Sequence, residues 1–210
     1  MRHALVSVLL VAAASTAGAQ SVASSRSPDA SRHLEFGPMI GWTSSGFVDT
    51  YPGSNISGQT GNRGHAIWGG AYARQPLARG LHAELQLAFE IKADNGANLS
   101  MPFLQLPLVV EYLPFAPRRG RAFVRPVLIA GASAGLRLGD GSVPDWWGRP
   151  RAGELSAVFG LGVEAHSKST GWMQLAMRVQ AGRSDLSAAP GRTTSNLLVF
   201  YIKAHPDARH

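Results

Sequence analysis

Charged side chains recur at every second position in several segments of the sequence. Glu84, Glu111, Arg125, Glu164 and Arg178 each have an apolar or proline neighbour on both sides. Carboxylates and guanidinium groups on one face of a sheet could pair in a structural network that satisfies buried charge. The same set could instead line a narrow polar path or gate. The sequence leaves both interpretations open and favours the structural network.

Residues that could carry out covalent or metal chemistry form no complete constellation. His166 and Ser167 are the one adjacent His-Ser pair, but no third group stands beside them to orient the base. The other histidines are scattered and the chain has no cysteine, which argues against zinc and thiol chemistry. Asp140 and Asp145 match no calcium loop and are typical of a solvated turn. We therefore expect no catalytic residue, no cofactor and no metal, and a protein that is not an enzyme.

The elements that position the charged residues are predicted from the stretch LHAELQLAFEIK, residues 81–92. Its apolar and polar side chains alternate almost without interruption. Successive side chains of a strand point to opposite faces, so this stretch predicts a strand with one apolar and one charged face. In a soluble sandwich the apolar face would be the core. In a membrane barrel that face would meet lipid, and the charged face would line the interior.

The rest of the chain repeats this pattern with no convincing helical period. We predict eight strands, at about 34–43, 63–74, 81–92, 101–112, 121–137, 154–165, 172–182 and 195–203. The last is apolar on both faces, so its register stays open, as does that of the first. The predicted connections are 44–62, 75–79, 93–98, 113–120, 138–152, 166–170 and 184–194. Long and short connections roughly alternate, as they do in outer-membrane barrels.

These patterns predict an all-β fold, an eight-stranded antiparallel up-and-down transmembrane β-barrel. The side chains expected to point inward are polar, and eight strands leave an interior that side chains fill. They are Glu84, Glu90, Lys92, Gln105, Glu111, Arg125, Arg137, Glu164, Gln174, Arg178 and Gln180. Trp42, Tyr72, Tyr112 and Trp172 fall near strand ends, where they could form interfacial girdles or simply pack. A soluble periplasmic β-sandwich remains an alternative.

The termini and the charge suggest an exported protein. Residues 1–19 combine a basic start, a short apolar run and a small-x-small site, as in a cleaved signal peptide. We expect a flexible leader at 20–33, the barrel at 34–204 and a tail at 205–210. The net charge of +7 is spread along the chain without a basic face interleaved with aromatics. This excludes nucleic acid as the expected partner and leaves outer-membrane lipid.

Several motifs resemble the PorT-type outer-membrane β-barrel domain family of bacteria. The most specific pieces are LQLPLVVEY at 104–112 and RPVLIAG at 125–131, and the resemblance covers about 34–203. Position 127 is Val where the family often has an aromatic residue, and the chain continues past Phe200 into KAHPDARH rather than ending on an aromatic residue. The resemblance implies a barrel of the cell envelope and carries no catalytic signature.

We therefore predict an outer-membrane barrel of a Gram-negative, or diderm, bacterium with a non-enzymatic structural or surface-interaction role. The expected barrel is monomeric. A small pore or transport-accessory barrel is the alternative, followed by a lipid A-modifying enzyme. Whether the interior conducts, and which ligand or protein partner the loops contact, stay open at the level of sequence.

Overall fold

The structure is a computed structural model. It describes residues 34–50, 57–95, 99–115, 122–139, 141, 151–167, 171–183, 186 and 192–205. The expected signal peptide at 1–19, the leader at 20–33 and nearly all of the tail at 205–210 lie outside these residues, as do Asp140 and Asp145. Within the described residues, no helix is long and apolar enough to cross a membrane.

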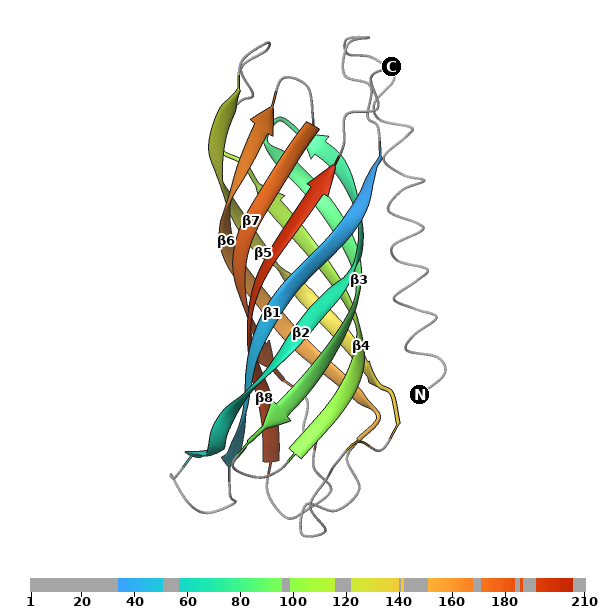
Figure 1. Ribbon diagram of the computed structural model, residues 1–210, viewed down its shortest axis with the longest axis vertical. Coiled ribbons are helices and arrows are strands. Elements are labelled where there is room, and N and C mark those ends of the chain that lie inside the picture. The colour runs from blue at the N-terminus through green and yellow to red at the C-terminus, as the bar shows by residue number, and fades with distance from the viewer. Residues whose placement is uncertain are drawn as a thin grey trace. The chain divides into compact units, whose positions relative to one another are not determined.

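Eight antiparallel strands form a closed barrel, which confirms the predicted fold class (Figure 1). Each strand pairs with the next one along the chain, and β1 pairs with β8 to close the sheet. The strands are β1 (Glu35–Thr50), β2 (Ser57–Ala78), β3 (Leu81–Asp94), β4 (Leu99–Tyr112), β5 (Phe123–Arg137), β6 (Gly153–Ser167), β7 (Gly171–Gly182) and β8 (Arg192–His205).

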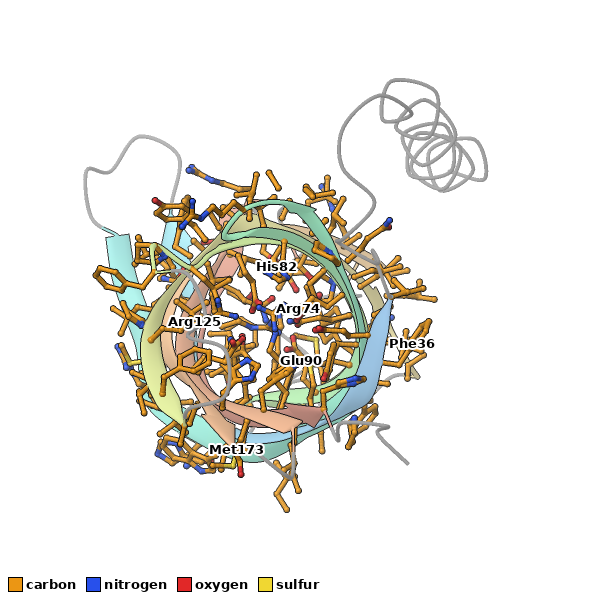
Figure 2. All side chains as sticks on the ribbon, turned by 90° about the horizontal axis from the view of Figure 1, so that it is seen from above. Phe36, Arg74, His82, Glu90, Arg125 and Met173 are labelled. Atoms are coloured by element: carbon orange, nitrogen blue, oxygen red, sulfur yellow. The ribbon has the colours of Figure 1, made fainter. Side chains whose placement is uncertain are left out.

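The alternation of side chains sorts residues to the two faces of the wall. Figure 2 shows Arg74, His82, Glu90 and Arg125 inside the ring of strands, with Phe36 and Met173 outside it. Large apolar side chains are exposed on every strand, whereas ten charged side chains are buried. A soluble sandwich would have the opposite distribution, because it buries its apolar face. The closed sheet and this inverted distribution rule out the β-sandwich alternative.

The strands meet at two rims. The terminal rim holds the start of β1, the end of β8 and the β2–β3, β4–β5 and β6–β7 connections, and the loop rim holds the other four. At the terminal rim, β2 and β3 are joined by Arg79 and Gly80 alone. Gly80 has a φ of 73°, which favours glycine, and a Cβ there would lie 2.4 Å from the carbonyl oxygen of Leu113.

The connections differ from the predicted ones mainly at the first hairpin. The sequence predicted a long connection at 44–62, but β1 continues to Thr50 and β2 begins at Ser57. At the terminal rim the 113–122 connection is longer than this 51–56 connection, so length alternates less regularly than predicted. The first hairpin was missed because its Gly, Ser and Thr residues lack apolar alternation, although their backbone still forms the ladder.

The register of β8 is settled by its pairing with both neighbours. Tyr201 and Lys203 lie opposite Gly41 and Met39 of β1, and they point inward with Ser195, Leu197 and Val199. Phe200 and Ile202 point outward and are exposed. Both faces contain large apolar residues because the interior of this barrel is partly apolar.

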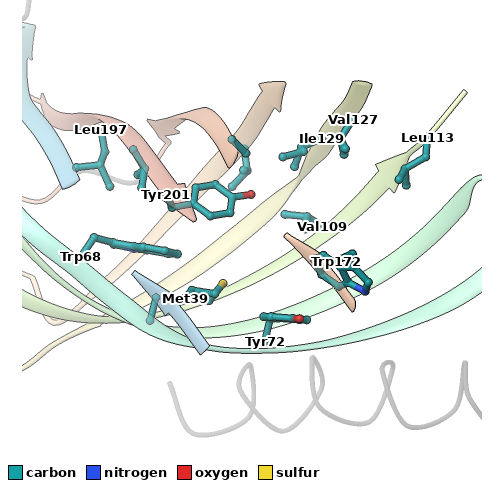
Figure 3. Close-up of a cluster of buried hydrophobic side chains, with 14 residues drawn as sticks. Met39, Trp68, Tyr72, Val109, Leu113, Val127, Ile129, Trp172, Leu197 and Tyr201 are labelled. Carbon is teal, nitrogen blue, oxygen red and sulfur yellow. The ribbon is translucent and has the colours of Figure 1, made fainter. Parts of the chain in front are cut away.

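An apolar cluster occupies the interior together with the charged residues (Figure 3). It includes Met39, Trp68, Tyr72, Trp172 and Tyr201, each no more than 5% exposed. Tyr72 and Trp172 therefore cannot belong to an interfacial girdle on the outer wall, and that interpretation is wrong for both. Trp42 and Tyr112 do point outward, with 44% and 47% exposure.

Candidate functional site

The interior of the barrel holds a balanced set of buried charges. Among the described residues, all the buried charged side chains are no more than 6% exposed. The cations are Arg74, Lys92, Arg125, Arg178 and Lys203, and the carboxylates are Glu84, Glu90, Glu111, Glu154 and Glu164. Positive and negative groups are equal in number, so the buried set is neutral when every group is ionised. Neutrality lowers the cost of burying charge, although each ion still needs a nearby partner.

Glu164 is the centre of the cluster nearest the terminal rim. Its Oε2 accepts a hydrogen bond from Nη1 of Arg74 at 2.8 Å, and its Oε1 accepts one from Nε of Arg125 at 2.8 Å. Nε2 of His166 lies 3.1 Å from the same Oε1. Arg125 and Glu164 are direct cross-strand partners of β5 and β6, whereas Arg74 reaches across the barrel from β2.

Lys203 links two further carboxylates in the same cluster. Its Nζ donates to Oε1 of Glu111 at 2.7 Å and also to Oε2 of Glu84. Glu111 is also paired with Nε of Arg74 at 3.1 Å, and it accepts a hydrogen bond from Gln174 at 3.0 Å. The cluster is therefore continuous across residues from β2, β3, β4, β5, β6, β7 and β8.

Arg178 lies among aromatic rings and is joined to this cluster through Gln86, whose Nε2 donates to Oε1 of Glu84 at 2.5 Å. Its guanidinium carbon is 4.7 Å from the centroid of Trp68 and 5.4 Å from that of Tyr201. It donates from Nη1 to the amide oxygen of Gln86, and its Nε and Nη2 have no hydrogen-bond partner within the described residues. No described carboxylate forms an ion pair with it. Cation–π contacts with two rings are the main compensation for its desolvation.

A second charged cluster lies toward the loop rim. Lys92 donates to Glu154 and, at 2.8 Å, to Oγ of Ser195, while Oε1 of Glu90 lies 3.5 Å from its Nζ. Gln105 donates to Oε1 of Glu90 at 2.8 Å. Phe47, Met101, Phe103 and Leu186 form a buried apolar cluster, and the Lys92 ammonium lies 4.9 Å from the Phe103 centroid.

Apolar side chains also lie buried at both ends of the interior. Leu113 is 1% exposed and its N–H donates to the carbonyl of Gly80 at 2.7 Å, at the terminal rim. Leu186, from the β7–β8 connection, is fully buried, and its carbonyl accepts a hydrogen bond from the N–H of Arg151 at 2.9 Å. Buried side chains thus occur at both ends of the described interior as well as in its middle.

The structure brings four of the five sequence-predicted residues into one cluster. Glu84, Glu111, Arg125 and Glu164 all lie in the cluster nearest the terminal rim, whereas Arg178 forms no described ion pair and is joined to the cluster only through Gln86. Sequence reasoning missed Arg74 and Lys203, which hold that cluster together. The strand alternation could have identified both. Arg74 lies an even number of positions after Trp68 and Tyr72, and Lys203 lies two positions after Tyr201, so each shares a face with these rings. Both were overlooked because their inward neighbours are aromatic rather than polar.

The remaining candidate residues do not form a reactive site. His166 and Ser167 are successive residues of β6, and the imidazole of His166 contacts Glu164 and stacks on Phe123 at a centroid distance of 4.6 Å. Their side chains leave the strand on opposite faces, so they do not form a nucleophile–base pair. Among the described residues, no group of three or more His, Asp or Glu side chains could hold a metal ion.

No protein-family model matches the chain, and no curated protein sequence matches it. Solved barrels are similar to it in structure. The N-terminal β-barrel domain of Pseudomonas aeruginosa OprF matches with a TM-score of 0.41 and 14% identity, over 80% of this chain and 99% of that one. Outer membrane protein AlkL in lipid bilayers matches with a TM-score of 0.47 and 8% identity, over 88% and 96%.

The attachment invasion locus protein Ail of Yersinia pestis gives a TM-score of 0.38 and 10% identity, over 82% of this chain and 99% of that one. At such identities a likeness extends to the fold alone. The interior network, rather than any relative, is therefore the basis for a functional conclusion.

Proposed function

We propose that this chain is a monomeric β-barrel of a bacterial outer membrane, with a sealed interior and a non-enzymatic structural or surface-interaction role in the envelope. The observation that carries this proposal is the neutral set of ten charged side chains in the interior, none more than 6% exposed. A conducting pore needs continuous water along its axis. Here the rings of Trp68 and Tyr201, packed against Arg178, lie between the two charged clusters, and no described hydrogen bond joins Arg178 to the cluster near the loop rim. The interior therefore supports a sealed barrel better than a conducting one.

The outer wall supports the membrane assignment. Apolar side chains are exposed on every strand, and closure leaves no unpaired sheet edge, which is the requirement for spanning lipid. The proposed orientation has the terminal rim in the periplasm and the loop rim outside the cell. The cleaved signal peptide at 1–19 and the PorT-type resemblance are part of the same proposal. The polar network then has a structural role, and the connections at the loop rim are the surface available to partners.

Planar-bilayer recording tests the sealed interior. The purified protein is expected to give no stable current steps in bilayers where a double variant, W68A/R178A, does give them. That variant removes one of the two rings that pack on Arg178, together with Arg178 itself, and leaves Tyr201 in place. Stable steps from the unmodified protein would contradict the proposal and favour the small-pore alternative.

Cell fractionation tests the location independently of conductance. The protein is expected in the outer-membrane fraction, and unboiled samples should migrate differently from boiled ones on an SDS gel, as folded barrels do. A protein that stays in the soluble periplasmic fraction would refute the membrane assignment. Lipid A mass analysis with and without the protein tests the enzymatic alternative, and an unchanged lipid A is expected.

A further inference from the structure

A recess of about 320 Å³ lies in the outer wall of the barrel, beside the loop rim. Its lining includes Ser44, Gly46, Arg63, Val179, Asn196 and Leu198. These residues come from β1, β2, β7 and β8, on both sides of the seam where β1 closes the sheet with β8. Ser44 faces outward and yet is only 6% exposed, because it forms the floor of this recess.

Irregular strand pairing explains why the recess exists. Between β1 and β2 the register shifts, so that Ser45 faces Gly64 and Phe47 faces Thr60. Three residues of β2, at positions 61–63, therefore lie against the single residue Gly46 of β1. A bulge of this kind bends the strand and redirects a side chain. Gly46 has no side chain to fill the space, and the neighbouring Ser44 has a short one.

The backbone of Arg63 is held in place by contacts on its other side. It pairs with Asp94 of β3, and Nδ2 of Asn95 donates to its carbonyl oxygen at 3.2 Å. The next residue, Gly64, lies so close to β3 that an added Cβ would be 2.4 Å from the backbone of Ala93. Arg63 is thus fixed at the edge of the recess. Its side chain is exposed and forms no ion pair with any side chain that the structure describes.

The chemistry of the lining changes across the recess. Arg63 and Asn196 lie nearer the loop rim, at the level of Gly46, and their guanidinium and amide groups can donate hydrogen bonds to the oxygens of a phosphate, as can the Ser44 hydroxyl. Further from the rim, Leu198 lies opposite Ser44 and pairs with Val179, and these two apolar residues continue the outer wall. Next to the recess the Trp42 ring stacks on His65 at a centroid distance of 4.8 Å. An exposed Trp beside polar residues is typical of the boundary between hydrocarbon and headgroups.

We propose that this recess binds one anionic lipid that carries a phosphate, with the phosphate at Arg63, Ser44 and Asn196 and an acyl chain along Val179 and Leu198. The inference rests on the proposed function in one respect, because lipid reaches this wall only if the barrel spans a membrane. A planar guanidinium forms two parallel hydrogen bonds to phosphate, so the site distinguishes charged from uncharged lipids. The lipid occupies a fixed place beside the β1–β8 seam.

The test is a binding titration of the full folded chain in a maltoside detergent, which contains no phosphate, read by native mass spectrometry. The probe is dioleoylphosphatidylglycerol. Dioleoylglycerol supplies the same chains without phosphate, and glycerol phosphate supplies the phosphate without chains. Both are expected to bind at least about tenfold more weakly than the phospholipid. Glycerol phosphate that binds as tightly as the lipid would overturn the lipid assignment and indicate a site for free phosphate.

Matched variants locate the site. R63Q is expected to weaken phosphatidylglycerol binding about tenfold, whereas R79Q removes the same charge at the opposite rim and should leave binding unchanged. Equal losses in the two variants, or no loss in R63Q, would refute the site.

S44L fills the floor and should weaken lipid binding, while A132L adds the same side chain to the outward face of β5 and should not. These two variants keep the proposal falsifiable if R63Q fails to fold, which the unboiled SDS gel would reveal. The titration in detergent reads the recess itself, so its failure is distinguishable from a failure of the outer-membrane assignment.

Discussion

Ser45 of β1 is hydrogen-bonded to the backbone of Ala93 in β3, across the intervening strand. Its Oγ accepts from the N–H of Ala93 at 2.8 Å and donates to the carbonyl of Ala93 at 2.7 Å. Direct pairing between β2 and β3 is interrupted between Arg63 and Gly69. The hydroxyl therefore replaces ladder hydrogen bonds that β2 does not supply, and Gly64 permits the approach because it has no side chain.

We expect S45A to lower the free energy of unfolding by about 1–3 kcal/mol, because it removes the Ser45 hydroxyl from a partly buried N–H and carbonyl of Ala93. Urea unfolding in detergent micelles would measure this. S156A is the matched control. The Oγ of Ser156 is buried and has no hydrogen-bond partner within the described residues, so its loss should cost much less. Equal costs for the two variants would mean that the Ser45 contacts add nothing.

Glu164 should be among the most sensitive positions in the interior. E164Q removes the negative charge that Arg74 and Arg125 share, and breaking a buried pair in this way costs about 3–5 kcal/mol. Glu35 provides the comparison, since it lies 3.6 Å from Arg74 at the terminal rim and its side chain is 26% exposed. E35Q should cost less than about 1 kcal/mol. A stable E164Q barrel would show that the interior accommodates an unpaired cation.

Lys203 and Glu84 should be energetically coupled. K203M leaves Glu84 without its cation, and E84Q leaves Lys203 with Glu111 as its one remaining carboxylate. The double variant K203M/E84Q removes both members of the pair. We expect it to be more stable than the sum of the single losses predicts, by about 0.5–3 kcal/mol. Additive losses in a double-mutant cycle would argue against the pairing.

Alanine variants at Gly80 and Gly139 would distinguish the cost of backbone strain from the cost of steric crowding. Both have positive φ, 73° and 79°, but a Cβ at Gly80 would meet the carbonyl of Leu113, whereas a Cβ at Gly139 would have no atom within 4 Å. G139A should cost only the conformational strain, about 1 kcal/mol. G80A should cost clearly more, because the β2–β3 turn must move away from Leu113. Thermal unfolding of the two variants, followed by circular dichroism, would measure the difference.

The sequence predicted the strands more completely than it predicted the side-chain contacts of the interior. Alternation places the strand at 81–92 without ambiguity, because one face is apolar and the other charged. It fails for β8, where Leu197, Val199 and Tyr201 point inward although they are apolar or aromatic. An eight-stranded barrel with a partly apolar interior removes the contrast between faces on which the pattern depends.

The partners of each charge could not be predicted for a different reason. Arg125 and Glu164 meet as neighbours across one strand pair, but Arg74 meets Glu164 from the opposite side of the barrel. Which inward charges meet across the barrel depends on strand tilt and stagger, and these are properties of the closed sheet as a whole. No single strand carries that information, so sequence reasoning identified candidate charges without their partners.

The same long-range pairing has a consequence for how the barrel assembles. Arg74 and Glu164 are separated by 90 residues, and Lys203 and Glu84 by 119, so neither pair can form in a nascent hairpin. A half-curled sheet would present these charges unpaired, and hydrocarbon accepts such groups only at high cost. For the outer-membrane barrel proposed above, curling, neutralisation of the interior and entry into the bilayer are therefore expected to occur together. Pairing of β1 with β8 closes the sheet that holds these long-range contacts.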